Sequence, residues 1–402
     1  MLIVKKFGGT SVGDSERIRN VARRCAEEYK KGNDVVVVLS AMGKTTDVLL
    51  EKAREINPKA SKRELDMLLT TGEQPSVALM SMSLHAMAIP AVSLNAFQVA
   101  MRATSNYGNA RLKKIDTERI CHELHERKIV VVTGFQGINK FGDYTTLGRG
   151  GSDTTAVALA AALHADACEI YTDVDGVYTA DPRKVPNARK LKEITYDEML
   201  DLATSGAGVL HNRSVEMAKK YGVPLVVRSS LNNSEGTVVK EVVSVERMLI
   251  SGVALDTDAV RIAVLGLRDV PGVAFKVFDT LAKKNINVDV ILQSIGRAGT
   301  KDISFTVNKD DLDDAVATLE ESQERLGFKE LHSERNIAKL SIVGSGMLSN
   351  PGVAAKMFES LYNEGVNINM ISTSEIRITV LINEKDGIRA MNAVHDAFGL
   401  AD

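Results

Sequence analysis

The first thirteen residues, MLIVKKFGGTSVG (1–13), join an apolar run to a glycine doublet. The apolar run predicts a strand over Leu2–Lys6, and a helical pattern begins near Ser15. The two glycines therefore lie on a turn that leads from a strand into a helix. A strand followed by a helix is the repeating unit of a mostly parallel sheet that is covered by helices, so this stretch sets the expectation for the fold.

The turn also has the chemistry of an anion site. Gly8 and Gly9 allow positive φ and a close approach of the backbone, so that successive N–H groups can point into one concavity. The following helix N-terminus adds the positive end of its dipole, and Lys6 adds a full charge. Together with the hydroxyls of Thr10 and Ser11, these groups predict a cradle for phosphate. Glycine-rich turns between strands and helices also occur for purely steric reasons, and that alternative stays open.

The alternation of strand and helix continues to about residue 230. The apolar, β-branched runs that indicate buried strands are Val35–Leu39, Ile129–Val132, Ala167–Tyr171 and Pro224–Arg228. The helical patterns between them include Ser15–Lys31, Arg63–Ala88 and Thr154–His164. This order predicts an α/β fold with a mostly parallel sheet sandwiched between helices, in which ligands bind at the carboxyl ends of the strands.

The composition favours small ligands over large polyanions. The chain has 402 residues, more than one hydrophobic core usually supports, so two or three domains are expected. Fifty lysines and arginines balance 52 aspartates and glutamates, which gives no basic footprint for nucleic acid or a membrane. The three cysteines are far apart and show no metal-type spacing, and no cleavable signal opens the chain. These features predict a cytoplasmic protein.

The last third of the chain contains a duplication. The stretch 269–294, DVPGVAFKVFDTLAKKNINVDVILQS, aligns without gaps on 349–374, SNPGVAAKMFESLYNEGVNINMISTS. In each copy a strand pattern precedes Pro-Gly, an amphipathic helix follows, and an asparagine-bearing turn leads into another strand. Two α+β modules of equal design are expected, packed as a pair. The alternative is that any small α+β domain can duplicate without a shared ligand.

Two further motifs carry candidate binding groups. In 145–155, TTLGRGGSDTT, Arg149 can grip a carboxylate through its bidentate fork, while Ser152 and Asp153 can meet an α-amino group or simply cap the helix. In 171–183, YTDVDGVYTADPR, two tyrosines and an arginine at the end of a strand can form a platform for a nucleotide base and ribose. A solvated loop is the simpler alternative for the second motif.

The motifs KFGGTSVG, LSAMGKTTD, TTGEQ, TTLGRGGSDTTAVALAAAL and YTDVDGVYTADPR occur in this order ahead of the paired Pro-Gly modules. The chain closely resembles the aspartate kinases of the amino-acid kinase family, over essentially its whole length. The resemblance implies a kinase domain at 1–245 and two ferredoxin-like ACT modules at 250–330 and 335–402. It also implies transfer of a phosphoryl group from ATP to L-aspartate, which gives 4-phospho-L-aspartate. That product leads toward lysine through diaminopimelate, and toward threonine and methionine.

The resemblance assigns roles residue by residue. Lys6, Gly8, Gly9, Thr172, Asp173, Tyr178 and Arg183 would contact ATP, and Mg²⁺ would be carried by ATP without protein ligands. Ser40, Thr46, Glu73, Arg149, Ser152 and Asp153 would line the aspartate pocket, with Lys6, Arg149 and Asp153 catalytic. Arg149 would hold the α-carboxylate, and Glu73 or Asp153 would lie near the ammonium. One departure is Gly208, which stands where several relatives carry a lysine that contacts ATP.

The resembling ACT modules imply feedback inhibition by lysine, threonine or both, and a homo-oligomer formed through these modules. The implied effector residues are Asp269, Gly272, Ala274, Asn287, Gln293, Asn367 and Ile368. Polar Asn and Gln side chains buried between apolar strands would need a partner, which an effector can supply. A shorter second product that starts at Met248 is conceivable.

Two alternatives remain at this stage. The first is a catalytically silent amino-acid sensor, against which the intact Lys6, Arg149 and Asp153 argue. The second is a sibling kinase that acts on glutamate or UMP, which would have no reason to combine the GRGGSD motif with twin ACT modules.

Overall fold

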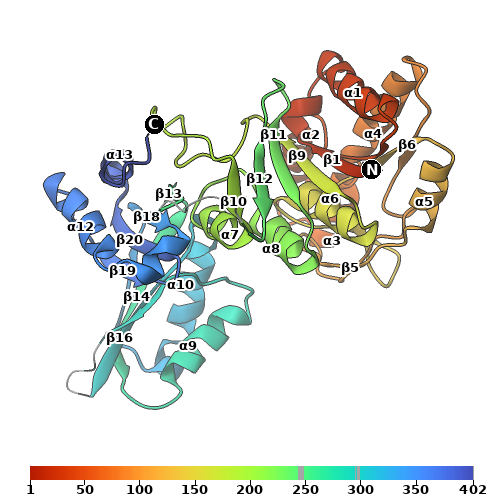
Figure 1. The fold of residues 1–402 in the computed structure, drawn as a ribbon. Helices are drawn as coiled ribbons and strands as arrows, with labels where there is room; N and C mark the ends of the chain where they lie inside the picture. The colour runs from red at the N-terminus through yellow and green to blue at the C-terminus, as the bar shows by residue number, and fades with distance from the viewer. Residues whose placement is uncertain (243–248, 295, 297–298, 402) are drawn as a thin grey trace. The chain divides into compact units, whose positions relative to one another are not determined.

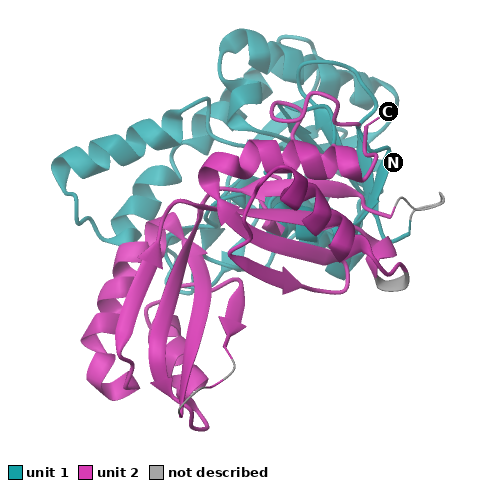
Figure 2. Cartoon of the chain, turned by 90° about the vertical axis from the view of Figure 1, so that its left-hand side faces the viewer, with its two compact units in different colours: residues 1–177, 190–203, 208–245 teal, residues 178–189, 204–207, 246–402 magenta. Residues whose placement is uncertain are grey.

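The structure is a computed structural model that describes residues 1–242, 249–294, 296 and 299–401, and Met248 lies outside them. Two compact units divide the chain, as Figure 2 shows in teal and magenta. Unit 1 comprises residues 1–177, 190–203 and 208–245, and unit 2 comprises residues 178–189, 204–207 and 246–402. Each unit is described by itself below.

Unit 1 is built on an eight-stranded sheet, drawn in red to green in Figure 1. In spatial order its strands are β10 (Glu193–Thr195), β12 (Thr237–Lys240), β11 (Leu225–Ser229), β9 (Ala167–Thr172), β1 (Leu2–Phe7), β2 (Asp34–Leu39), β6 (Ile129–Thr133) and β3 (Ala91–Leu94). All neighbouring strands pair in parallel except β11 and β12. The predicted α/β class with a mostly parallel sheet is confirmed.

Helices cover this sheet on both faces. The unit contains η1 (Gly9–Val12), α1 (Ser15–Lys30), α2 (Thr45–Ile56), α3 (Lys62–Leu69), α4 (Glu73–His85), α5 (Glu118–His125), α6 (Gly151–Ala162), α7 (Tyr196–Thr204) and α8 (Asn212–Tyr221). Phe7, Val35 and Val37 pack with α1 and α4 in one core. Because side chains alternate along a strand, Lys6 and Val36 face the opposite side, where α6 contacts β1 and β2.

One predicted helix is two helices in the structure. The expected helix Arg63–Ala88 divides into α3 and α4. Thr70 ends α3, where its hydroxyl donates back to the carbonyl oxygen of Asp66 at 2.8 Å, and Gly72 precedes the first residue of α4. Pro75 lies in the first turn of α4, where a missing backbone N–H leaves no intrahelical bond unmade. The break places Glu73 at a helix N-terminus.

A small second sheet flanks this region of unit 1. Its strands are β5 (Leu112–Lys114), β4 (Arg102–Ala103), β7 (Gln136–Ile138) and β8 (Tyr144–Thr146), in that spatial order. The β8 strand leads directly into the Gly148–Gly150 turn and α6. This sheet therefore positions the approach to the GRGGSD motif.

Unit 2 contains two four-stranded sheets of similar design. The first module has β14 (Ala259–Arg268), α9 (Val273–Ala282), β15 (Ile291–Gln293), β16 (Thr300–Asn308), η2 (Lys309–Asp311), α10 (Leu312–Glu321), α11 (Gln323–Leu326) and β17 (Glu330–Glu334). The second has β18 (Ile337–Val343), η3 (Ser345–Ser349), α12 (Val353–Asn363), β19 (Met370–Thr373), β20 (Arg377–Asn383), η4 (Glu384–Asp386) and α13 (Gly387–Ala397). Helices α9 and α12 start 80 residues apart, after glycines with φ of +88° and +97°, as the duplication predicts.

The second module takes one strand from before the first. Strand β13 (Gly252–Asp256), within the range expected for the first module, pairs antiparallel with β18. Lys339 on β18 forms ion pairs with Asp256 on β13 and with Asp289 of the first module, at 2.9 and 2.5 Å. The first module is therefore inserted between two strands of the second, and a buried lysine joins them.

Residues 178–189 also pack within unit 2, although they follow a strand of unit 1. Ala180 and Val185 lie in the core of the second ACT-like module. The hydroxyl of Thr179 lies 2.9 Å from Nε2 of the buried His395 on α13. The loop after β9 thus leaves unit 1 and joins unit 2. Across the described residues, the structure contains no helix with the length and apolar character needed to cross a membrane.

Candidate active site

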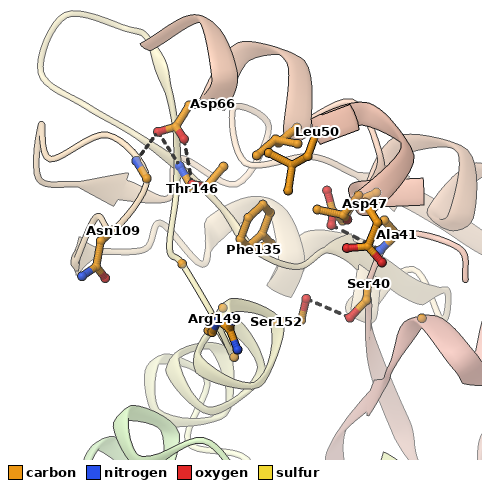
Figure 3. Close-up of a pocket in the computed structure, with 18 of the residues that line it drawn as sticks. Ser40, Ala41, Asp47, Leu50, Asp66, Asn109, Phe135, Thr146, Arg149 and Ser152 are labelled. Carbon is orange, nitrogen blue, oxygen red and sulfur yellow. Dashed lines mark hydrogen bonds between the residues drawn. The ribbon is translucent and has the colours of Figure 1, made fainter. Parts of the chain in front are cut away.

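A cleft of about 920 Å³ opens in unit 1 at the carboxyl ends of β1 and β2. Nine of the predicted contacts line it: Lys6, Gly8, Gly9, Ser40, Thr46, Glu73, Arg149, Ser152 and Asp153. Figure 3 shows part of this lining, with Ser40, Arg149 and Ser152 around the lower part of the cleft. The structure therefore brings the whole predicted aspartate set together with the first phosphate contacts.

The glycine turn needs its glycines for a steric reason. A Cβ on Gly9 would lie 2.7 Å from the carbonyl oxygen of Ala41, which is closer than real Cβ atoms approach. The turn can therefore pass close beside the loop after β2 only with glycine at this position. Gly8 and Gly9 line the cleft, whereas the hydroxyl-bearing residues Thr10 and Ser11 of the same turn are absent from its lining.

Lys6 and Asp153 form an ion pair across the cleft. Their Nζ and Oδ1 atoms are 2.6 Å apart, and each side chain is 12% exposed. Lys6 projects from β1 toward α6, and Asp153 lies in the first turn of α6, where the helix dipole favours a negative charge. The pair holds the lysine charge beside the glycine turn.

The GRGGSD turn places an arginine and a serine at the opposite wall. Gly150 has φ of +65°, and a Cβ there would overlap the side chain of His211, so only glycine fits between the turn and the residue that caps α8. The hydroxyl of Ser152 receives a hydrogen bond from that of Ser40 at 3.0 Å. Arg149 forms no ion pair with any carboxylate among the described residues. Its fork is thus available to a ligand carboxylate.

Glu73 presents a buried carboxylate to the cleft. The residue is 2% exposed, and burial raises the pKa of its carboxyl to about 7. One oxygen, Oε1, accepts a hydrogen bond from the backbone N–H of Ala41 at 3.2 Å. The other oxygen, Oε2, has no hydrogen-bond partner among the described residues. A buried carboxylate oxygen without a partner fits a site for a positively charged ligand group.

Sequence reasoning missed a second group of residues that shape this cleft. Asp66 on α3 is 1% exposed and accepts hydrogen bonds from the backbone N–H groups of Gly108 and Thr146, at 2.9 and 3.0 Å, and from the Thr146 hydroxyl at 2.7 Å. Burial raises the pKa of Asp66, while these hydrogen bonds act against the rise. The signal that could have indicated Asp66 is a carboxylate placed among the leucines of a helical pattern.

Arg213 fixes the same region from α8. Its Nη1 donates to the carbonyl oxygen of Leu147 at 2.5 Å and to Oδ1 of Asn109 at 3.0 Å, and its Nη2 donates to the carbonyl oxygen of Ala110 at 2.9 Å. Asp66 and Arg213 therefore anchor the two loops that precede Arg149 in the cleft wall. Other lining residues that the sequence did not single out are Ala41, Gly43, Asp47, Leu50, Lys62, Leu65, Leu69, Tyr107, Phe135, Gly148 and Gly151.

The remaining predicted ATP contacts do not line the cleft. Thr172 ends β9, and its hydroxyl donates to Oδ1 of Asp173 at 3.0 Å. Tyr178 and Arg183 belong to unit 2, where the Arg183 guanidinium pairs with Asp181 at 3.0 Å. A Cβ on Gly208 would meet no atom within 4 Å, so the glycine in place of lysine is not imposed by crowding.

The predicted effector residues lie at the surface of unit 2. Asn287, Gln293 and Asn367 are exposed, so the expectation that they are buried between apolar strands is wrong. For Gln293 the physical reason is that β15 is an edge strand of its sheet and all three of its residues face solvent. Asn287 and Asn367 lie on the turns that lead from α9 to β15 and from α12 to β19. The other members are Asp269, which pairs with Lys301 at 2.8 Å, Gly272 before α9, Ala274 in its first turn, and the half-buried Ile368.

Comparison with known proteins identifies the class. Residues 1–229 match the model of the amino acid kinase family, and residues 262–323 and 340–398 match an ACT domain model. The chain belongs to the amino acid kinase family and is an ATP-dependent kinase with ACT domains.

The relatives point to one branch of that family. The chain is 53% identical over 401 residues to the aspartokinase of Bacillus sp. (strain MGA3), covering 100% of this chain and 98% of the relative. It resembles the crystal structure of E. coli aspartokinase III in complex with aspartate and ADP (R-state), with a TM-score of 0.86, 26% identity and 99% coverage of both chains. The same enzyme in complex with lysine and aspartate (T-state) gives a TM-score of 0.75 at 27% identity, again with 99% coverage of both chains.

Proposed function

We propose that the chain transfers the γ-phosphoryl group of MgATP to the β-carboxylate of L-aspartate, giving ADP and 4-phospho-L-aspartate. The observation that carries this proposal is one cleft that combines the glycine turn and the Lys6–Asp153 ion pair with two open groups. Within the described part of the chain, Arg149 has no carboxylate partner and Oε2 of Glu73 has no hydrogen-bond partner. The E. coli relative that binds aspartate and ADP supports the same pair of ligands.

The cleft offers complementary charge for an amino acid. In the proposed complex the fork of Arg149 receives the α-carboxylate in a bidentate arrangement. Between the two predicted partners for the ammonium, Glu73 is favoured, because its Oε2 has no partner among the described residues, whereas Asp153 forms an ion pair with Lys6. Ser40, Thr46 and Ser152 complete the wall around the bound amino acid.

The reaction itself requires positioning and charge stabilisation. The β-carboxylate has an ordinary pKa of about 4, so it is ionised at neutral pH and needs no general base. A bond forms between a β-carboxylate oxygen and the γ-phosphorus while the bond from that phosphorus to the ADP oxygen breaks. Lys6 and the N–H groups of the glycine turn stabilise the negative charge on the group in transfer. Asp153 keeps the lysine ammonium directed toward that group.

The residues proposed to contact the nucleotide rest more on the resemblance than on the lining of the cleft. Gly8 and Gly9 cradle the phosphates in this proposal, and Thr172 and Asp173 contact the nucleoside. Tyr178 and Arg183 stay in the proposed set on the resemblance alone. Among the described residues, no group of three or more His, Cys, Asp or Glu side chains is arranged to hold a metal. Mg²⁺ would therefore be held by phosphate oxygens, whose charge it neutralises.

Regulation forms the second part of the proposal. Lysine, threonine or both would bind at the ACT modules through Asp269, Gly272, Ala274, Asn287, Gln293, Asn367 and Ile368, and inhibit the kinase as pathway end products. The lysine complex of the E. coli relative supports an amino-acid effector. The edge strands β15 and β19 expose the apolar side chains of Ile291, Leu292 and Ile371, which supports pairing of modules in a homo-oligomer. Coupling of about 1–3 kcal/mol would change affinity roughly 5- to 150-fold.

Trapping of the acyl phosphate with hydroxylamine tests this function. The full chain is incubated with MgATP and either L-aspartate or L-glutamate, with and without lysine and threonine. We expect hydroxamate to form from aspartate but not from glutamate, and we expect less hydroxamate when lysine or threonine is present. A product from glutamate rather than aspartate would indicate a sibling kinase. A rate with aspartate that does not change when lysine and threonine are added would contradict the regulatory part while leaving the kinase assignment intact.

A further inference from the structure

The hydroxyl of Ser11 belongs to the glycine turn but has no role in the cleft. Ser11 is 3% exposed, and its Oγ has no hydrogen-bond partner among the described residues. A buried hydroxyl without a partner is unfavourable, because it has lost its hydrogen bonds to water. Ser11 lines a second cavity of about 280 Å³, which shares no lining residue with the catalytic cleft.

Helix α1 and the loop after β11 form the walls of this second cavity. The α1 residues are Arg17, Asn20, Val21, Arg23, Arg24 and Glu27, and Ser230, Leu231 and Asn233 face them. Positions 17, 20, 21 and 24 follow helical spacing, so they lie on one face of α1. The arginines at both ends of this stripe therefore point toward the same space.

The charge of the cavity lining is positive. Three guanidinium groups stand against one carboxylate, that of Glu27, and Asp14 outside the lining contacts Arg17 at 3.3 Å. Backbone carbonyl groups hold two of the arginines: Arg17 Nη1 donates to Thr10 O at 2.6 Å, and Arg24 Nη2 donates to Asn232 O at 2.7 Å. Each guanidinium has five N–H donors, so these contacts leave others for a ligand.

We infer that this cavity is a second anion site, which binds inorganic phosphate or a small phosphate monoester through Arg17, Arg24 and Ser11. Arginine forks match the geometry of phosphate oxygens, and the Ser11 hydroxyl gains the acceptor that it lacks in the protein. The volume suits a small anion and is below the range of ordinary drug-sized ligand pockets. The binding groups come from α1 and from η1, outside the catalytic cleft.

The position of the site links it to the glycine turn. Gly9 lines the catalytic cleft and Ser11, two residues later in η1, lines the second cavity. An anion that is bound to Ser11 and Arg17 therefore contacts the turn from the side of the second cavity, not from the catalytic cleft. Arg17 already contacts this turn through Thr10. Occupancy of the second cavity would stabilise the turn in the conformation that faces the cleft.

Isothermal titration of the full chain with inorganic phosphate tests the site. A saturating non-hydrolysable MgATP analogue and L-aspartate are present throughout, so that the phosphoryl positions of the catalytic cleft are already filled. The variants are Arg17→Gln and Arg24→Gln, and the matched control is Arg19→Gln, an exposed arginine of the same helix outside the lining. We expect saturable binding by the parent chain and the control, and affinity weaker by at least about tenfold in the other two, because each loses charge-assisted hydrogen bonds.

Further titrations compare two phosphate ligands and control for charge screening and for variants that do not fold. Ribose 5-phosphate in place of phosphate shows whether a monoester binds more tightly, and chloride at equal ionic strength shows the effect of charge screening alone. Absence of saturable heat from both phosphate ligands, or equal affinity in all variants, would overturn the site. Ser11→Ala, which removes no charge, should weaken binding severalfold and serves if an arginine variant fails to fold. The heat of binding does not depend on turnover, so a failure of the kinase assignment would be seen separately.

Discussion

Lys5 and Lys6 are neighbours on β1, yet the two faces of the sheet give them different surroundings. Lys6 faces α6 and the cleft, where its ammonium pairs with Asp153 at 2.6 Å. Lys5 faces α1, where its Nζ pairs with Glu169 Oε2 at 2.5 Å and donates to the Tyr171 hydroxyl at 3.2 Å. Burial alone would lower the pKa of Lys5, but the surrounding groups, Glu169 first and Tyr171 next, together outweigh burial and raise that pKa.

The difference distinguishes Lys6, whose charge lies beside a ligand site, from Lys5, whose charge is used inside the fold. On the α1 face, Glu169 also contacts the Tyr171 hydroxyl and Arg228, so both of its carboxylate oxygens have partners. On the cleft face, Glu73 keeps an unpaired oxygen and Arg149 has no carboxylate partner among the described residues. Open donors and acceptors, rather than charge or burial, mark the functional face.

Lys6→Ala should give the largest effect on catalysis. It removes a donor that stabilises the transferring phosphoryl group, and we expect kcat to fall at least ~100-fold, comparable to the loss of one transition-state donor. The fold should remain, because the rest of β1 pairs as before. Steady-state kinetics and circular dichroism measure the two quantities. A near-normal kcat would remove Lys6 from the mechanism.

Lys5→Met is the matched substitution on the other face. It leaves Glu169 buried with Tyr171 and Arg228 as remaining partners. We expect the free energy of unfolding to fall by about 2 kcal/mol, less than the full loss of a buried ion pair because two partners remain. Denaturant unfolding measures this, and kcat of the folded enzyme should stay within about threefold of the parent. A large loss of kcat with normal stability would reverse the proposed division between the faces.

The carboxyl of Glu73 should make aspartate binding depend on pH. Its pKa of about 7 means that the ionised form, which attracts the ammonium, dominates at pH 8 and is lost as the pH falls through 7. The KM for aspartate should therefore rise about tenfold between pH 8 and pH 6. In Glu73→Gln the KM should be high at both pH values. A pH-dependent KM that persists in Glu73→Gln would assign the titration to another group.

Asp66→Ala should give a smaller change that is specific to the amino acid. It releases the backbone of Gly108 and Thr146, which precedes Arg149, and we expect the KM for aspartate to rise about fivefold. The KM for ATP should change less than about twofold. Asp66→Asn, which keeps an acceptor for these N–H groups, should restore most of the affinity.

Ile120→Val is the control for the Asp66 substitutions. Ile120 is fully buried on α5, a helix that contributes no residue to the cleft lining. Its substitution should lower stability without changing either KM. An equal rise of both KM values in Asp66→Ala, or a rise in the control, would show a general structural defect instead of a positioning role.

The sequence predicts the fold and the cleft well where local patterns decide them. The β-branched runs and the glycine turn correctly predicted strands β1 and β2 and the mostly parallel sheet, whereas the set of cleft residues came from the resemblance. The break between α3 and α4 was missed because apolar periodicity continues across Thr70–Gly72, although Pro75 was a signal. Asp66 and Arg213 were missed because their partners are backbone groups far along the chain, which no local pattern reveals.

Local sequence patterns also could not predict which residues are exposed at the edges of the sheets. Gln293 follows the apolar residues Ile291 and Leu292, which suggested burial, yet the spatial order of the strands leaves β15 at an edge. Strand order is set by long-range pairing, as is the pairing of β13 with β18 across the whole first module. Such features became visible only when the chain was folded.

Isotope transfer from labelled aspartate tests the central claim most directly. The full chain is supplied with MgATP and L-aspartate that carries ¹⁸O in the β-carboxylate, and the phosphorus of the acyl phosphate is observed by ³¹P NMR. The account predicts an ¹⁸O-shifted phosphorus from the β-labelled substrate and an unshifted one from α-labelled aspartate, because Arg149 holds the α-carboxylate away from ATP. A shift from the α-labelled substrate, or a phosphorylated product without label from either, would contradict it.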